Sequence, residues 1–546
     1  MKYKSQFWVL LNFVFLSLSN LCSPCLSLNI RPITKSRQNK DRFGLNQHLE
    51  RKTAKTNHDS AAILKGRKHE LKCQNERIHD DENLISLGMT VALFSTYFTV
   101  ISAKCALPST FALLTAPNSG LSFSTASTSI TSSATIAIGQ QSMSKLLTLS
   151  TFSIALGKFF LGPIIDAIGG IRSLQISLTL LSTLLALIST TSSFYTFSMA
   201  WLLVDFIFSS CWAASLNAVH QSFPSKYWTT KVGMLASAAR SGNTFAFAAF
   251  AFILNSNTMQ MILSRCLNFL RQSNSIDLGK NGQNLDPAWR TIFLVASLLQ
   301  IIPIFLLTCF GNKFASSSQN MTSSKINEQQ QHQNSEIQQT STFAIIEKLL
   351  RTPLFWLHLT SRTSLMIFGS FLLFVPTFMT HCYGLSSSQS AQVASVFSLG
   401  CLGSLVFGSK PYSNLSHKKK QSFVLTGMLF ISTICAVCQW LHVSSFFPMV
   451  KLSPAIGTAI MFLWGLSFSI PFYLPPSLYA LEKGGKSSSA TIADIFDIGG
   501  FALLAFFNGY VGSIPHEIKN AWSTTFKLLI LSSACSMISL NVASKM

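Results

Sequence analysis

Two arginines lie deep inside long apolar runs. Arg240 follows Val232 by eight residues and Arg362 follows Leu354 by eight, so a helical rise of about 1.5 Å places each about 12 Å inside its run. A charge at that depth costs several kcal/mol and therefore faces a cavity or a partner. Because a guanidinium offers paired donors to carboxylate or phosphate, the two arginines predict an anion clamp, and His358, one turn before Arg362, could share its face. The alternatives are an ion pair or a surface-reaching side chain for each arginine, and an interface hydrogen bond for His358.

Three carboxylates lie in runs of the same kind. Asp494 and Asp497 are three residues apart, which puts them on neighbouring parts of one helix face, where two close carboxylates favour a titrating pair and proton coupling. The alternative is that Asp494 pairs near the end of its run while Asp497 alone faces a cavity. Asp205 could contribute to solute binding or pair with Arg240.

These side chains belong to a largely apolar chain. Of 546 residues, 48% are hydrophobic and only 11% are charged, against roughly 25% charged residues in soluble domains. The mean hydropathy is +0.39. Twelve runs approach the 20 or so residues that a bilayer requires, which predicts an all-α integral membrane protein with twelve transmembrane helices. The runs are 84–103, 146–168, 173–194, 196–219, 232–254, 291–310, 354–380, 390–409, 422–441, 455–476, 490–513 and 523–543.

Polar stretches divide these runs into two six-helix halves. The Ser-, Gln- and Asn-rich segment between the sixth and seventh runs cannot supply a packed core and is interpreted as a linker. A second Ser- and Thr-rich stretch, 108–144, is expected to be a partly disordered loop, and Pro471, Pro475 and Pro476 are expected to break the tenth helix. The predicted domains are a signal peptide-like segment 1–27, a basic transit-like or disordered tail 28–82, an N-terminal half 83–310, a polar cytosolic linker 311–345 and a C-terminal half 346–546.

The basic residues indicate topology rather than nucleic-acid binding. The formal net charge of +22 resides mostly in the N-terminal tail and in alternate loops, which predicts that both termini and the linker face the cytosol or a stroma-like compartment. The N-terminal segments fit two addresses. One is the plastid envelope of an alga with secondary plastids, and the other is a secretory-pathway or plasma membrane.

The turn between the second and third runs is built from small and charged residues. Its glycines allow close helix approach and a sharp reversal, and its aspartate can cap a helix start. With the two six-helix halves, this turn resembles the signature of the major facilitator superfamily over about 84–543, although Ala167 stands where a basic residue usually follows the aspartate. The residues concerned are Gly157, Lys158, Gly162, Asp166, Gly169, Gly170 and Arg172.

A finer resemblance is to the organophosphate:phosphate antiporters and sugar-phosphate exchangers. Lys158 between Gly157 and Gly162 is similar to the sequence pattern of their second helix. Trp356 near the start of the seventh run and Pro376 towards its end are similar to the pattern of their seventh helix. Their phosphate-binding arginines from helices one and seven have no counterpart here, since the first run has no arginine and Gly369 marks the other position.

The resemblance implies a secondary active transporter that moves a small anionic solute, organic or phosphorylated, by alternating access. We expect Arg240 and Arg362 to bind the anion, with His358, Asp497 and Asp205 in secondary recognition and Asp494 with Asp497 in coupling. Asp166 is expected to contact the start of the eleventh run, near Asp494, or a nearby basic residue when the inner side is shut. The expected partners are the solute, membrane lipid and a proton or phosphate counter-substrate, without nucleic acid, metal, cofactor or enzymatic chemistry. Two alternatives stay open: a proton-coupled carrier of a neutral or cationic solute, and a non-transporting receptor or scaffold.

Overall fold

The computed structural model describes residues 86–114, 132–255, 261, 288–311, 342–385, 387–415, 417–444, 450–512 and 519–546. Its contacts divide the chain into two compact units, Met1–Gly88 and Met89–Met546, and the account below concerns the second. The predicted segments 1–27 and 28–82 lie outside the described residues, as does nearly all of the predicted linker. The last residues assigned to that linker already belong to the helix α12 (Thr342–Leu350).

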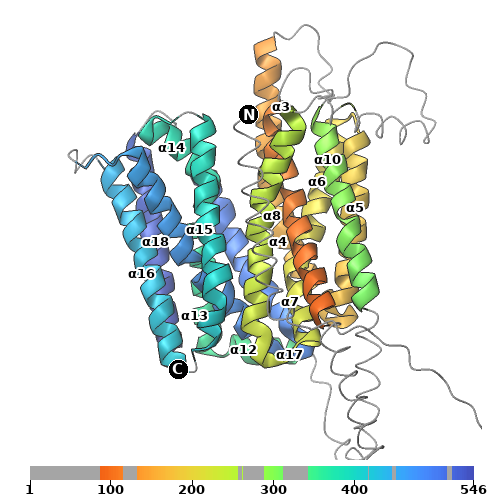
Figure 1. The fold of residues 1–546 in the computed structure, drawn as a ribbon, viewed down its shortest axis with the longest axis vertical. Coiled ribbons are helices and arrows are strands. Elements are labelled where there is room, and N and C mark those ends of the chain that lie inside the picture. Colours follow the sequence, from red (N-terminus) through yellow and green to blue (C-terminus); the bar gives the residue numbers. More distant parts are fainter. Residues whose placement is uncertain are drawn as a thin grey trace, which may run out of the picture. The chain divides into compact units, whose positions relative to one another are not determined.

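The described part of the N-terminal half consists of helices (Figure 1). The first span, Ser86–Thr110, runs into α3 (Ala106–Leu114). Two serines, the half-buried Ser182 and the buried Ser297, hydrogen-bond each other between the third and sixth spans at 3.2 Å. The other helices are α4 (Ser132–Ile168), α5 (Gly170–Thr190), α6 (Phe194–Phe208), α7 (Ser210–Ser222), α8 (Trp228–Asn255) and α10 (Ala288–Leu299), with the turn η1 (Ser225–Tyr227) before α8.

The C-terminal half follows α12 with helices of similar length. Its first span, Pro353–Tyr383, changes to a tighter helical turn where Pro376, which lacks an N–H, interrupts the regular hydrogen bonding. Its elements are α13 (Pro353–Ser370), η2 (Phe371–Phe374), α14 (Val375–Tyr383), α15 (Ser387–Ser413), α16 (Lys418–Val443), α17 (Pro454–Gly512) and α18 (Lys519–Ala543). In Figure 1, α15 lies beside α8 of the other half, and the two helices are in contact.

Eleven helices among the described residues are long and apolar enough to cross a membrane. They match eleven of the twelve predicted runs. The remaining predicted run, 232–254, is also helical, as α8, but it is not among the eleven. Its Arg240, Asn243 and several serines and threonines make it more polar than its neighbours.

Two expectations about chain breaks are wrong. The stretch 108–144 is not simply a loop, because α3 continues to Leu114 and α4 already begins at Ser132. The prolines of the tenth run do not end its helix. The helix α17 passes through all three and is irregular at Gly485, whose φ of 55° separates a first limb, Pro454–Gly485, from a second limb that begins at Ser487. Glycine tolerates this left-handed conformation, which L side chains rarely adopt.

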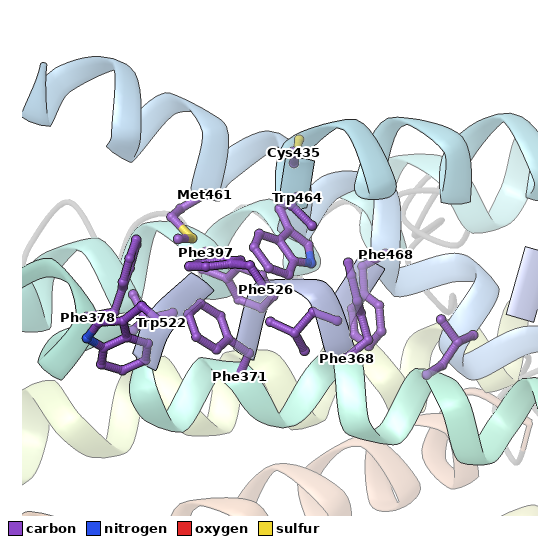
Figure 2. Packing of buried hydrophobic residues seen from close by; sticks show 14 of the residues in the cluster. Phe368, Phe371, Phe378, Phe397, Cys435, Met461, Trp464, Phe468, Trp522 and Phe526 are labelled. Carbon is purple, nitrogen blue, oxygen red and sulfur yellow. The ribbon is translucent and has the colours of Figure 1, made fainter. Parts of the chain in front are cut away.

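Aromatic side chains form the core of the C-terminal half (Figure 2). Phe371 of η2 stacks on Trp464 of α17 with ring centroids 5.5 Å apart. Phe378 of α14 packs on Phe526 and Trp522 of α18 at 5.0 and 5.3 Å. Because each large ring removes much apolar surface from its surroundings and interlocks three helices, this half is built to move as one body.

Close helix approach within this half depends on glycine. A Cβ added to Gly465 of α17 would lie 2.2 Å from the Phe397 carbonyl oxygen of α15, so backbone would have to shift. At Gly427 of α16, by contrast, an added Cβ meets nothing within 4 Å.

We therefore expect Gly465→Ala to lower the free energy of unfolding by about 1–3 kcal/mol, because overpacking forces α15 and α17 apart. The matched control, Gly427→Ala, should be neutral or slightly stabilising because alanine has the higher helix propensity. Thermal unfolding of the purified variants in detergent measures both. Equal melting temperatures for the two variants would contradict the packing described here.

Candidate functional site

A buried lysine of one half binds two carboxylates of the other. Lys158 lies on α4, and its Nζ is 3.0 Å from Asp494 Oδ1 and 2.9 Å from Asp497 Oδ2, both on the second limb of α17. The ammonium also donates to the Ser209 carbonyl oxygen at 3.2 Å. Only 4% of the Lys158 side chain and 1% of the Asp494 side chain are exposed. The predicted face shared by the two aspartates is therefore present, and it is directed at the N-terminal half.

The second carboxylate also binds an arginine. Arg362 of α13 donates from Nε to Asp497 Oδ1 at 2.9 Å, and its Nη2 lies 2.8 Å from the same oxygen. Its Nη1 donates to the Phe472 carbonyl oxygen at 2.7 Å, and the guanidinium lies 3.9 Å from the Phe472 ring centroid. Of the alternatives open for Arg362, the structure shows the ion pair with a nearby carboxylate.

Lys158, Asp494, Asp497 and Arg362 together form what we term the ion network. Two cations and two carboxylates alternate in it, so its formal charge is zero when all four are ionised. Removing one member would strand a buried charge, which is strongly destabilising, whereas removing a matched pair is often tolerated. The network thus joins the two halves through four charges, each of which is stable in the interior only while its partners are present.

Closer to the predicted cytosolic end, Asp166 makes the contact expected of it. Its Oδ2 accepts from the Thr491 N–H at 2.8 Å and from the Thr491 hydroxyl at 2.6 Å, and its Oδ1 accepts from the Ala490 N–H at 3.1 Å. These N–H groups lie near the start of the second limb of α17, where a helix favours a negative charge. Asp166 thus contacts the start of the eleventh run rather than a basic residue.

Asn217 of α7 completes this contact, which we term the latch. Its Nδ2 donates to Asp166 Oδ1 at 2.9 Å, and its Oδ1 accepts from the Gly170 N–H at 2.8 Å. In Figure 1, α7 and α17 meet at the same end as α12. Nothing in the sequence singled out Asn217, since an uncharged amide in an apolar run has no membrane cost large enough to mark it as functional.

The glycines of the predicted turn act as expected, by allowing close approach. A Cβ on Gly162 would lie 3.0 Å from the Thr491 Cα, and one on Gly157 would lie 2.2 Å from the Ser209 hydroxyl. Gly169 has a φ of 96°, which permits the reversal between α4 and α5. Arg172 is exposed near the start of α5.

Arg240 is buried at the contact between the halves without a carboxylate partner among the described residues. It is 9% exposed, and its Nε has no hydrogen-bond partner in the described part of the chain. Its guanidinium lies 5.5 Å from the ring centroid of Tyr473, which is on the first limb of α17. Trp212 of α7 packs on this tyrosine at 5.6 Å and on Tyr97 of the first span at 5.0 Å. The two tyrosines were not predicted.

Two other predicted residues lie outside the ion network. Asp205 does not pair with Arg240, which corrects that expectation: it forms an ion pair with Lys104 and accepts from the Ser150 hydroxyl, all within the N-terminal half. Lys104 also lies over the Trp201 ring, 5.0 Å from its centroid. His358 packs on the Tyr479 ring at 4.7 Å within the C-terminal half, and its Nδ1 has no hydrogen-bond partner among the described residues, so neither a solute contact nor the alternative interface hydrogen bond is seen there.

The described residues contain no group of three His, Cys, Asp or Glu side chains placed to hold a metal ion.

A model of the Major Facilitator Superfamily matches residues 85–507 of the chain. The chain belongs to the major facilitator superfamily. The resemblance seen in the predicted turn is thereby confirmed at the level of the superfamily, and the match spans both halves. No curated protein sequence matches the chain.

Solved structures of superfamily transporters share the fold. The transporter FucP in the outward conformation is 12% identical, with a TM-score of 0.51, over 83% of this chain and 98% of that one. The proton:xylose symporter XylE bound to 6-bromo-6-deoxy-D-glucose is 10% identical, with a TM-score of 0.55, over 84% and 95%. The family and these proteins are transporters, which indicates a transporter rather than an enzyme.

The ion network predicts a specific pattern of stability. We expect Lys158→Met to lower the free energy of unfolding by about 3–5 kcal/mol, because it strands Asp494 and removes one of the two cations at Asp497. Adding Asp494→Asn should recover much of this loss, since Arg362 still neutralises Asp497. Thermal unfolding in detergent measures the series, and a double variant no more stable than Lys158→Met would count against the network.

The latch predicts an effect on conformational cycling. Asp166→Asn removes the negative charge at the start of the second limb of α17, so we expect solute flux in proteoliposomes to fall several-fold while solute-dependent thermal stabilisation stays nearly intact. Glu482→Gln, an exposed acid on the first limb of α17, is the matched control and should leave both unchanged. Binding lost in proportion to flux in the Asp166 variant would exclude a purely conformational role.

Proposed function

We propose that the chain is a secondary transporter of a small anionic solute and that Arg240 binds the negative charge of that solute. The observation that carries this proposal is a buried guanidinium that no carboxylate of the described residues neutralises. The guanidinium has a side-chain hydrogen bond with Tyr473, but a charge without a counter-ion in such a place is costly, and an anion brought by the solute would offset that cost when it binds.

The other cations buried in the spans support this choice by contrast. Lys158 and Arg362 belong to the ion network, and Lys104 pairs with Asp205. Arg290 reaches the Thr190 carbonyl oxygen and the Ser192 hydroxyl, both at 3.3 Å, where α5 ends. Of the two arginines predicted to form the clamp, Arg240 is thus the one whose charge is available, while Arg362 is already neutralised by Asp497.

The position of Arg240 suits alternating access. It belongs to α8 of the N-terminal half and lies against Tyr473 of the C-terminal half, so a solute held there would contact both halves and would sense their relative movement. Aromatic faces at Tyr473, Tyr97 and Trp212 offer apolar surface for the body of an organic anion. A carboxylate and a phosphate both fit a guanidinium, so the organophosphate group stays one proposal within this class.

The second candidate is a proton-coupled carrier of a neutral solute. It is favoured by the carboxylates of the ion network, which could carry a proton. The solved proton:sugar symporters, at 10% and 12% identity, share the fold and do not decide between the two candidates. In this case Arg240 would have a structural role.

The sequence also carries our proposals that the protein resides in a plastid envelope or in a secretory-pathway or plasma membrane, and that it binds membrane lipid.

A thermal-shift screen distinguishes the two candidates. Purified protein is heated with inorganic phosphate, sugar phosphates, mono-, di- and tricarboxylates, or neutral hexoses, because a solute that binds the folded state raises the melting temperature by mass action. We expect at least one anion to raise it by several degrees and Arg240→Gln to abolish the rise. Arg351→Gln is the matched control, since Arg351 is 77% exposed and pairs with Glu347 on the surface.

Stabilisation of both wild type and Arg240→Gln by a hexose, with no effect of any anion, would overturn the anionic proposal and favour the neutral carrier. If an anion raises the melting temperature of Arg240→Gln as much as that of the wild type, the solute is still an anion, but Arg240 does not bind it.

A further inference from the structure

The two carboxylates of the ion network differ in how completely they are bound. Asp497 uses both oxygens: Oδ1 receives Arg362 and Oδ2 receives Lys158. Asp494 uses one, because Oδ1 receives Lys158 while Oδ2 is buried without a hydrogen-bond partner among the described residues. A proton added to a buried carboxylate oxygen that has no donor breaks no existing hydrogen bond. It also removes a buried negative charge that the surroundings do not fully stabilise.

Asp494 Oδ2 is buried against the glycine face of α4. A Cβ added to Gly162 would lie 3.2 Å from this oxygen, so the glycine face of α4 packs directly against it. The charged or titratable groups that face Asp494 are Lys158 and Asp166 on α4, Cys211 on α7 and Asp497 on its own helix. One cation thus faces three acidic or weakly acidic groups in addition to Asp494 itself. From α13, Arg362 contributes through its ion pair with Asp497.

Separation of the halves divides these charges unevenly. Arg362 and Asp497 both belong to the C-terminal half and remain paired, whereas Lys158 leaves with the N-terminal half. Asp494 is then the carboxylate that has lost its cation, at a depth where a lone charge costs several kcal/mol. A proton on Oδ2 converts it to a neutral acid and removes that penalty. The Lys158 ammonium keeps its contact with Asp497 Oδ2 until the halves part.

We propose that Asp494 is the protonation site whose occupancy releases the two halves at their predicted cytosolic ends, so that transport is coupled to protons through this residue and not through Asp497. The inference rests on the proposed transport function. It adds the identity of the coupling ion and of the carboxylate that carries it. When the halves part, the Lys158 ammonium leaves Oδ1 and a proton from the cytosolic solution bonds to Oδ2 of Asp494. When Lys158 returns, the carboxyl gives that proton up to solvent, so each cycle of the network takes up and gives back one proton.

The test measures opening directly and without any solute. Spin labels are placed at Lys226→Cys in η1 and at Lys483→Cys near the end of the first limb of α17, both exposed positions, after the twelve native cysteines have been replaced. The full chain is reconstituted in lipid nanodiscs, and double electron–electron resonance gives the distance distribution from about pH 8 to about pH 5. We expect the longer-distance population to grow as the pH falls, because protonated Asp494 no longer holds Lys158.

Substitutions assign the effect to one residue. Asp494→Asn should show the longer distances at every pH, because the amide is a permanently neutral substitute, while Asp497→Asn is the matched control and should keep a pH-dependent distribution. Lys158→Met with Asp494→Asn keeps the buried charges balanced. It should be insensitive to pH even if the single Asp494 variant does not fold.

A wild-type distribution that does not change with pH would overturn the proposal, and so would an unaltered pH response in the Lys158→Met, Asp494→Asn variant. Arg240→Gln should leave the pH response in place. A failure of the anion-binding proposal, seen as loss of any anion-dependent thermal shift, is therefore distinguishable from a failure of the proton site.

Discussion

A charge buried in the membrane-spanning part of a protein must have an opposite charge beside it, and here the partners of one lysine come from the other half of the molecule. Lys158 projects from α4 to Asp494 and Asp497 of α17, and Arg362 supplies the second cation. Because the effective dielectric constant is low there, these attractions are stronger than at a surface, and so is the penalty for breaking them singly. The same pairs that hold the halves together therefore define what must change before they can separate.

Close packing makes this pairing possible. The glycines of α4 bring its backbone near α17 and near the end of α6, so that short side chains such as Asp166 and Asp494 can reach across. Asp166 lies eight residues after Lys158 on α4, which corresponds to about 12 Å along the helix. The latch and the ion network are thus two successive connections between the same pair of helices. The latch ties a carboxylate to helix N–H groups, and the network ties charge to charge.

The sequence predicted much of this arrangement and failed at identifiable points. Helix positions followed from apolar run length, and the Asp166 contact followed from a motif with a known partner helix. The partner of each charged side chain could not be predicted in this way, because run boundaries give the depth of a residue but not the rotation of its helix or which helices are neighbours. Arg240 was one possible partner of Asp205, whereas Asp205 binds Lys104. Neutral residues such as Asn217 and Tyr473 carried no signal, since only charges are costly enough in a membrane to stand out.

Local composition also gave wrong predictions of where two helices begin and end. The Ser- and Thr-rich residues before the second span are helical from Ser132, and three prolines stay within α17, because tertiary packing and neighbouring groups outweigh local propensity. Gly485, not a proline, is where that helix changes direction.

The central claim, that Lys158 joins the halves and must leave its carboxylates when the predicted cytosolic side opens, is tested most directly by a structure of the open state. Electron cryomicroscopy of the full chain in lipid nanodiscs, with an antibody fragment selected against the accessible cytosolic face, would supply it. The account predicts that Lys158 Nζ lies far from both Asp494 and Asp497 in that state while Arg362 remains bound to Asp497. An open structure in which Lys158 still contacts either carboxylate would contradict it.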